Sequence, residues 1–179
     1  RALSGRDRPG APSRSDDGDP WMSDRRPPQK PIIRIGTVFS GIGAVEHALQ
    51  RLGMPHEIVF AGDIDKFVRQ TYFANFDISE DRWHDDITEF DATPFRGKVD
   101  LLVGGSPCQS FSMVGRRAGL EDDRGDLFFE FVRVLREARP KAFIFENVRG
   151  VLSHDEGRSW DSMSRALRES GYSIHFEVL

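Results

Sequence analysis

Disulfides, membrane-length apolar runs and a strong excess of one charge are all missing from this sequence. Its single cysteine, Cys108, excludes an internal disulfide and a zinc site built from several thiolates. No apolar run approaches the ~20 residues of a membrane-spanning helix, and no signal peptide is visible. The net charge of −4 excludes the basic excess of a protein that grips nucleic acid over its whole surface. We therefore expect a cytoplasmic protein without a membrane segment.

Branched apolar residues are almost absent from the first 31 residues, which hold six of the ten prolines. Seven basic and five acidic side chains are mixed in the same segment. Such a composition cannot bury enough apolar area to offset the entropy of the chain. We expect residues 1–31 to be disordered and residues 32–179 to form the folded part.

Apolar runs alternate with amphipathic segments through the folded part. Strands are predicted at residues 32–39, 57–61, 99–103, 142–145 and 172–179, with a short segment around 85–88 inside a loop-like stretch. Helices are predicted between them, around residues 45–52, 65–75, 128–135 and 160–167. This alternation indicates an α/β fold with a mostly parallel sheet and helices on both faces. Because the sequence ends inside the last predicted strand, we also expect a truncated chain.

Two glycines lie between the first strand and the first helix, in the segment 39–43. Backbone N–H groups of such a turn can approach a ligand at the helix N-terminus, although tight turns also need glycine for their own geometry. Asp63 follows the second strand, 20 residues after Gly43, where a carboxylate can accept ribose hydroxyls. The third glycine of a dinucleotide-binding fingerprint is missing after Gly43. This favours a nucleoside ligand without a pyrophosphate. Asp86 and Ile87 are candidates for adenine contacts; helix capping or solvation is the alternative for both aspartates.

Cys108 directly follows the predicted strand 99–103, at the edge where open α/β sheets bind ligands. A lone cysteine there is either a small buried hydrophobe or a nucleophile. Glu146 similarly follows the strand 142–145, and a carboxyl group beside apolar strand residues can hold a proton near neutrality. If the two strands are neighbours, the thiol and the carboxyl group face one pocket. A salt bridge of Glu146 to Arg149 or Lys141 is the alternative.

Six segments, in their order along the chain, resemble the DNA (cytosine-5)-methyltransferases of the bacterial restriction-modification type. They are Phe-Ser-Gly-Ile-Gly at 39–43, Asp-Ile-Asp at 63–65, Asp-Ile at 86–87, Pro-Cys-Gln-Ser-Phe-Ser at 107–112, Gly-Leu-Glu-Asp-Asp-Arg-Gly-Asp-Leu-Phe at 119–128 and Glu-Asn-Val at 146–148. The resemblance covers residues 34–179. It implies a Rossmann-like S-adenosylmethionine-dependent methyltransferase fold in a bacterial cytoplasmic enzyme.

The resemblance also implies S-adenosylmethionine as the cofactor. Asp63 would bind the ribose, Asp86 the adenine amino group, and Phe39 would stack on the adenine. The full set of implied cofactor-binding residues is Phe39, Ser40, Gly41, Ile42, Gly43, Asp63, Ile64, Asp86, Ile87, Pro107 and Leu127. The family usually has Glu where Asp63 stands, and Asp is one methylene shorter.

The implied reaction is methyl transfer to C5 of cytosine in duplex DNA, on a base flipped into the pocket. Cys108 would add to C6 of the base, Glu146 would protonate or hydrogen-bond N3, and Asn147 would orient the loop around Cys108. The implied DNA contacts are Gln109, Ser112, Arg116, Arg117 and Arg124, with a solvated loop as the alternative for the arginines. We expect no metal, because the five histidines share no ligand spacing.

The family's later motifs and its target-recognition region do not occur in this sequence. We therefore expect the isolated chain to be inactive or weakly active, with its C-terminal half or a second chain supplying the recognition region. Two alternatives remain open. One is a non-catalytic fragment or subunit that binds the cofactor, and the other is a tRNA cytosine-5 methyltransferase of the same fold.

Overall fold

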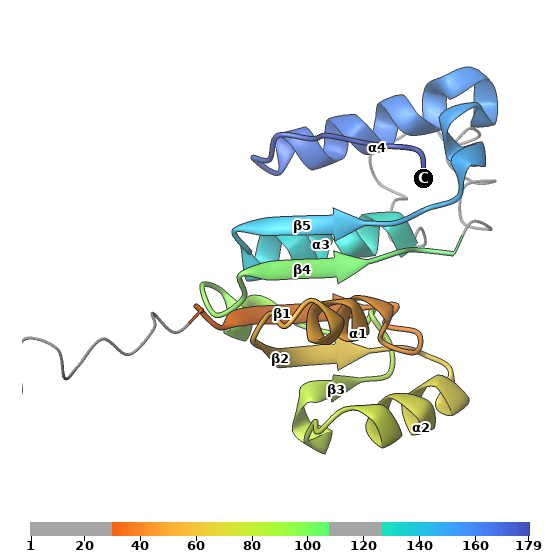
Figure 1. Ribbon diagram of the computed structural model, residues 1–179. Helices are drawn as coiled ribbons and strands as arrows, with labels where there is room; N and C mark the ends of the chain where they lie inside the picture. Colours follow the sequence, from red (N-terminus) through yellow and green to blue (C-terminus); the bar gives the residue numbers. More distant parts are fainter. Residues whose placement is uncertain (1–29, 108–126) are drawn as a thin grey trace, which may run out of the picture.

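The computed structural model describes residues 30–107 and 127–179, so most of the segment expected to be disordered lies outside the described residues. Five parallel strands form one sheet in the order β3-β2-β1-β4-β5 (Figure 1). The strands are β1 (Ile33–Val38), β2 (His56–Gly62), β3 (Trp83–His84), β4 (Leu101–Gly104) and β5 (Ala142–Phe145). The predicted α/β architecture is therefore confirmed.

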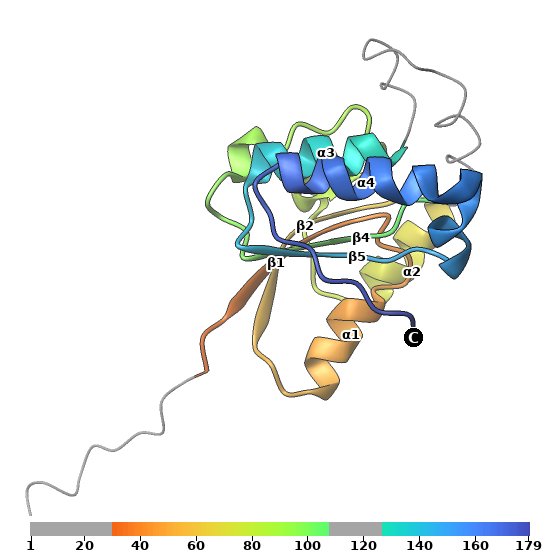
Figure 2. The same cartoon turned by 90° about the horizontal axis from the view of Figure 1, so that it is seen from above.

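Helices cover both faces of the sheet (Figure 2). On one face lie α1 (Ala44–Arg51) and α2 (Lys66–Asn75), and on the other lie α3 (Leu127–Ala138) and α4 (Arg158–Glu169). Short 3-10 turns complete the described connections: η1 (Glu80–Arg82), η2 (Thr93–Phe95), η5 (Arg149–Leu152) and η6 (His154–Gly157). Within the described residues, no helix is long and apolar enough to cross a membrane.

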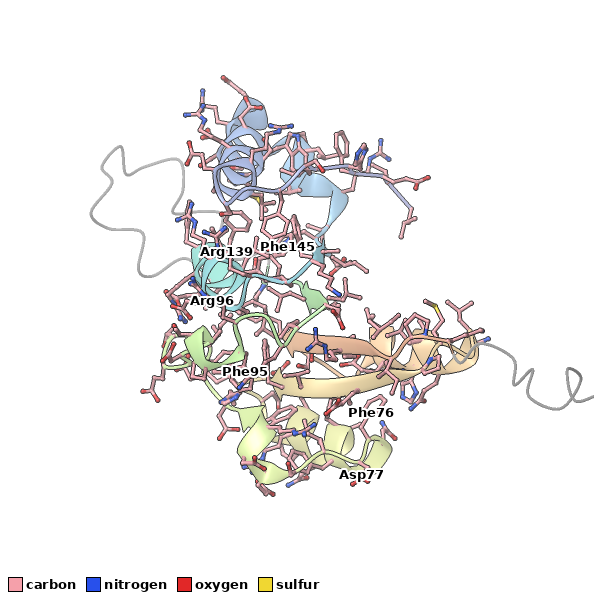
Figure 3. All side chains as sticks on the ribbon, turned by 90° about the vertical axis from the view of Figure 1, so that its left-hand side faces the viewer. Phe76, Asp77, Phe95, Arg96, Arg139 and Phe145 are labelled. Atoms are coloured by element: carbon pink, nitrogen blue, oxygen red, sulfur yellow. The ribbon has the colours of Figure 1, made fainter. Side chains whose placement is uncertain are left out.

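Each face of the sheet has its own apolar core. Phe131 and Leu135 of α3 are fully buried, one helical turn apart, and pack with Leu102 of β4. Burying side chains of this size contributes about 1.5–3 kcal/mol each. On the opposite face, Tyr72 of α2 and Phe76, directly after that helix, belong to the second core cluster. Figure 3 labels Phe76 on that side and Phe95 and Phe145 in the layer of α3.

The helix ends follow the sequence signals. The Asp65 side chain accepts a 2.7 Å hydrogen bond from the backbone N–H of Phe67, and so caps α2 as predicted. Gly53 follows α1 with φ 60°, the left-handed conformation that glycine adopts at helix ends without strain.

An ion-pair cluster joins the strands at their amino ends. The guanidinium of Arg34 on β1 donates two 3.0 Å hydrogen bonds to the carboxylate of Asp100, just before β4. Lys141, just before β5, lies 2.8 Å from the same carboxylate. These contacts hold the pKa of Asp100 well below its usual range. Lys141 therefore pairs with Asp100, which removes one of the two salt bridges considered for Glu146.

The prediction of a last strand at residues 172–179 is wrong: the structure assigns no strand there. The Tyr172 hydroxyl donates a 2.7 Å hydrogen bond to the carbonyl of Pro140, and Phe176 packs on Trp160 of α4 while remaining 62% exposed. Weak alternation of apolar residues does not make a strand, because a strand also needs a neighbour that satisfies its backbone groups. Among the described residues, none pairs with this segment.

Candidate functional site

The carboxyl ends of the parallel strands share one edge of the sheet, and a cavity of about 280 Å³ lies there. Residues from the ends of β1, β2, β3 and β4 and from the start of α3 contribute to its wall. The cofactor-binding residues proposed from the sequence that line it are Phe39, Asp63, Ile64, Asp86, Ile87, Pro107 and Leu127. Ser40, Gly41, Ile42 and Gly43 lie in the adjoining turn and are not part of the cavity wall.

The turn after β1 is fastened to the end of β2. Ser40 Oγ accepts a 2.9 Å hydrogen bond from the backbone N–H of Gly62 and donates one of 3.0 Å to its carbonyl. Gly43 has φ 80°, and a Cβ added there would lie 2.2 Å from the Phe76 ring. Glycine at this position is therefore required both by the backbone conformation and by the close approach of Phe76.

Phe39, the last residue before this turn, is a non-glycine residue with φ 54°. A left-handed conformation costs roughly 1–2 kcal/mol for an L-residue. Residues held in such conformations cluster where a side chain must take a particular position. In this chain the strained residue contributes its side chain to the cavity wall.

Asp63 fixes the same turn from the end of β2. Its Oδ2 accepts a 3.0 Å hydrogen bond from the backbone N–H of Gly41, and its Oδ1 accepts one of 3.0 Å from that of Asp65. The cap of α2 is Asp65, so Asp63 is not the helix cap. Its carboxylate instead joins the glycine turn to the cavity wall.

Asp86 lies two residues beyond β3 and also lines the cavity. Its Oδ1 accepts hydrogen bonds from the backbone N–H and the hydroxyl of Thr88, at 2.9 and 2.8 Å. This local turn accounts for one carboxylate oxygen. Among the described residues, no hydrogen bond to the other oxygen is seen.

The cavity also contains residues that the sequence motifs did not identify. They are Thr37, Val38, Phe60, Ala61, Gly62, His84, Asp85, Phe90 and Gly105. His84 stacks on Phe90 with ring centroids 3.9 Å apart, and burial lowers its pKa. Its Nε2 is buried with no hydrogen-bond partner in the described part of the chain. The signal that could have found most of them is position, because nearly all lie at or just beyond a strand end.

The ends of β4 and β5 meet beside the cavity, as the predicted neighbouring strands require. The backbone N–H of Glu146 donates a 2.9 Å hydrogen bond to the carbonyl of Gly104, and Asn147 Nδ2 donates one of 3.0 Å to that of Ser106. A Cβ on Gly105 would lie 3.0 Å from Oε2 of Glu146. The Glu146 side chain is exposed rather than enclosed by strand residues.

Several predicted site residues lie outside the described residues. They are Cys108, Gln109, Ser112, Arg116, Arg117 and Arg124. Pro107, directly before Cys108, is the last residue of the first described range, so the position of the thiol stays a prediction. Within residues 30–107 and 127–179, no group of three His, Cys, Asp or Glu side chains is arranged to hold a metal ion.

One known protein family matches most of the chain. A family model described as C-5 cytosine-specific DNA methylase matches residues 33–179. The chain belongs to this methylase family. Among its relatives, the orphan methyltransferase M.SPRI of Bacillus phage SPR is 44% identical over 147 residues, which are 82% of this chain and 33% of that protein. The type II methyltransferase M.BanI of Aneurinibacillus aneurinilyticus is 40% identical over 151 residues, which are 82% of this chain and 34% of that protein.

Solved structures share the fold of this chain. The crystal structure of the S. pombe Dnmt2 methyltransferase superposes with a TM-score of 0.56 at 23% identity, over 75% of this chain and 40% of that one. A putative DNA modification methyltransferase from an E. coli prophage gives 0.56 at 25% identity, over 76% and 38%. The chain spans about a third of the length of the curated relatives named above.

Proposed function

We propose that this protein transfers a methyl group from S-adenosylmethionine to C5 of cytosine in duplex DNA. The observation that carries the proposal is the cavity at the strand ends, where the carboxylates of Asp63 and Asp86 and several apolar side chains lie beside the joined ends of β4 and β5. Membership of the C-5 cytosine-specific DNA methylase family supports the same reaction.

The residues of the cavity fit the cofactor that this reaction needs. In this proposal the Asp63 carboxylate accepts hydrogen bonds from the ribose hydroxyls, and the Asp86 carboxylate accepts one from the adenine amino group. Phe39 stacks on the adenine. The side chains of Ile64, Ile87, Pro107 and Leu127 supply the apolar walls, and the turn 40–43 holds the methionine end. When bound, S-adenosylmethionine supplies an electrophilic methyl group on a sulfonium centre.

The reacting groups come from the ends of β4 and β5. In this proposal the Cys108 thiolate adds to C6 of cytosine, which forms a covalent S–C6 bond and makes C5 nucleophilic. Glu146 protonates or hydrogen-bonds N3 and so stabilises the charge on the ring. C5 takes the methyl group, and S-adenosylhomocysteine would be the leaving group. A base then removes the C5 proton, the S–C6 bond breaks with release of the thiolate, and any proton given to N3 returns to Glu146. The hydrogen bond from Asn147 to Ser106, two residues before Cys108, supports a positioning role for Asn147.

The DNA is bound in this proposal with the target base flipped out of the duplex, because the ring face that the thiolate attacks is otherwise covered by the neighbouring stacked bases. Gln109, Ser112, Arg116, Arg117 and Arg124, which follow Cys108 closely in the sequence, make the contacts to the DNA. The relatives are about three times as long as the matched segment. We therefore propose that a recognition region in the same protein or in a second chain completes the enzyme, which acts in the bacterial cytoplasm, and that this segment alone has little activity.

The proposal is tested by covalent trapping on duplex DNA that contains 5-fluorocytosine, in the presence of S-adenosylmethionine. The fluorine blocks the final proton loss, so the chain is expected to form a stable protein–DNA adduct in low yield. The yield is expected to rise when the proposed recognition region is added as a second chain. Cys108→Ser is the matched control and forms none. An adduct that persists in Cys108→Ser, or methyl label that enters tRNA and not duplex DNA, would contradict the proposed reaction.

A further inference from the structure

The cavity wall formed by residues 86–90 lacks regular secondary structure of its own. It carries Asp86 and Ile87, two of the residues proposed to contact adenine, and Phe90, on which His84 stacks. The turn has internal hydrogen bonds, from Thr88 to Asp86 Oδ1 and between its own backbone groups. These local bonds do not fix the turn against the rest of the fold, so contacts from other elements decide where it lies.

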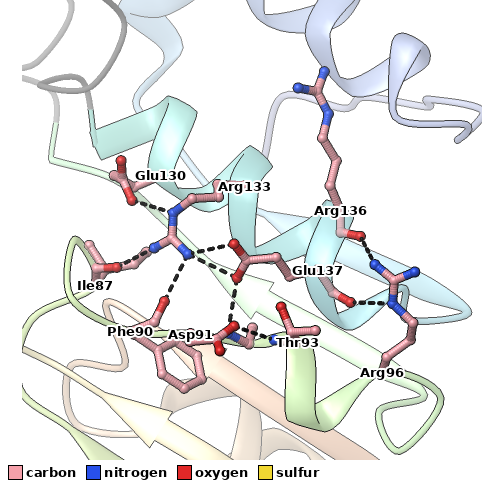
Figure 4. Close-up of polar contacts among 10 residues, drawn as sticks. Ile87, Phe90, Asp91, Thr93, Arg96, Glu130, Arg133, Arg136 and Glu137 are labelled. Atoms are coloured by element: carbon pink, nitrogen blue, oxygen red, sulfur yellow. Dashed lines mark hydrogen bonds and ion pairs between the residues drawn. The ribbon is translucent and has the colours of Figure 1, made fainter.

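Those contacts come from α3 (Figure 4). Arg133 Nη2 donates a 2.5 Å hydrogen bond to the carbonyl of Ile87, and Nη1 donates one of 2.8 Å to the carbonyl of Phe90. Both carbonyls belong to residues that line the cavity. The two bonds therefore fix each end of the turn that follows Asp86.

The guanidinium of Arg133 is itself held in place from two sides. Its Nε donates a 2.7 Å hydrogen bond to Glu130, and its Nη1 lies 2.9 Å from the carboxylate of Glu137. Glu137 also accepts a 2.9 Å hydrogen bond from the backbone N–H of Ala92, just beyond the turn. A planar guanidinium with five donors can serve all these acceptors at once, and an ammonium group cannot.

We propose that Arg133 is a positioning residue for the cofactor: it holds residues 86–90 so that Asp86 faces the adenine amino group. This inference rests on the proposed function, and it concerns an arginine that does not line the cavity. Because α3 also supplies Leu127 to the wall, one helix both lines the cavity and fixes its adenine side.

A merely structural role would also make Arg133 important, so the test must separate stability from recognition. Arg133→Lys keeps the positive charge but loses the planar set of guanidinium N–H donors. Arg136→Lys is the matched control on the same helix, because Arg136 donates to Ser170 Oγ at 2.9 Å, toward the end of α4. Urea unfolding identifies conditions under which both variants of the full chain are folded.

The measurement is the affinity for two probes under those conditions, by titration calorimetry: S-adenosylhomocysteine and S-inosylhomocysteine, which lacks the adenine amino group. The wild-type chain and Arg136→Lys are expected to prefer the adenine probe by about tenfold or more, the usual worth of a hydrogen bond to a charged group. Arg133→Lys is expected to lose most of that preference, because Asp86 is no longer held toward the amino group.

A folded Arg133→Lys variant that keeps the wild-type preference would overturn the positioning role while leaving the proposed function intact. If the wild-type chain binds neither probe, the cofactor assignment itself fails, and the role of Arg133 fails with it. Should Arg133→Lys prove unfolded, Glu137→Gln replaces it, since this change removes the charge that orients Arg133. A folded Glu137→Gln that retains the full preference counts equally against the inference.

Discussion

The Tyr72 hydroxyl donates a 2.5 Å hydrogen bond to Oε1 of Glu46, and the two side chains are 0% and 2% exposed. Tyr72 belongs to α2 and Glu46 to the first turn of α1, so the bond joins the two helices that cover one face of the sheet. Burial, together with the neighbouring carboxylate, raises the pKa of Tyr72 far above its usual value. The phenol therefore stays protonated and remains a donor to Glu46.

Removing the donor of this pair should cost more than changing its acceptor. Tyr72→Phe leaves a buried carboxylate without the phenol and is expected to lower the free energy of unfolding by about 1–3 kcal/mol. Glu46→Gln keeps an acceptor oxygen for the same hydroxyl and should cost less. Urea unfolding of both variants and of the double variant measures the coupling, and equal, additive losses would show that the bond contributes nothing.

The left-handed glycine at the start of α1 gives a second expectation. Gly43→Ala must place a methyl group 2.2 Å from the Phe76 ring, in addition to adopting φ 80°. Gly53→Ala is the matched control, because it has φ 60° but open space around its Cβ. Gly53→Ala should cost about 1 kcal/mol from conformation alone, and Gly43→Ala about 1–3 kcal/mol more from the clash. Thermal melts that show equal losses would contradict this clash.

His84 predicts a pH dependence of stability. Burial lowers its pKa below the ordinary 6.5, so between the lowered value and 6.5 the unfolded chain binds a proton that the folded chain does not. The contribution of His84 is thus fully present above pH 6.5 and is lost as the pH falls through this window. His84→Phe preserves the stacking on Phe90 and should flatten this part of the pH profile, measured by urea unfolding from pH 7.5 to 5. The exposed His175→Gln serves as control, and a flattening of the same size there would refute the assignment.

Gly105→Ala should slow the chemistry more than it weakens cofactor binding, because its added methyl group meets Glu146. The added methyl would lie 2.9 Å from the backbone carbonyl of Glu146 and 3.0 Å from its Oε2, so the residue must shift. Misplacing a proton donor in this way is expected to lower the rate of adduct formation on 5-fluorocytosine DNA by about tenfold or more. Gly150→Ala, where the nearest atom is 4.0 Å away, should leave the rate unchanged. A parallel loss of S-adenosylhomocysteine affinity in Gly105→Ala would instead indicate a general distortion of the cavity.

Sequence reasoning succeeded where local signals suffice. The period of Phe128, Phe131 and Leu135, followed by Pro140, predicts α3 closely, and Asp65 caps α2 as its position before the helix suggests. It failed at residues 172–179, because pairing depends on a neighbouring strand that no local pattern reveals. The short strand β3 lies just before the short segment expected around 85–88, inside the stretch predicted as loop-like, since two residues carry no periodicity.

The candidate site divides in the same way. Strand order alone brings Glu146 to the end of β4, and the motifs identify Asp63 and Asp86 in the cavity wall. Arg133 could not be found from the sequence, because its bond to Ile87 joins residues 46 positions apart and concerns a backbone carbonyl. A sequence shows which side chains are present. It does not show which backbone carbonyl groups, far away in the chain, a side chain will reach.

The ion pairs of Asp100 with Arg34 and Lys141 lie where β1, β4 and β5 begin, whereas the cavity lies where the strands finish. The ion-pair cluster and the cavity therefore lie at opposite ends of the same sheet. Substitutions of Arg34, Asp100 or Lys141 are expected to change the melting temperature while the carboxylates that face the ligand keep their surroundings. A change in ligand specificity that accompanied such substitutions would then indicate that the strands transmit a structural change from one end of the sheet to the other.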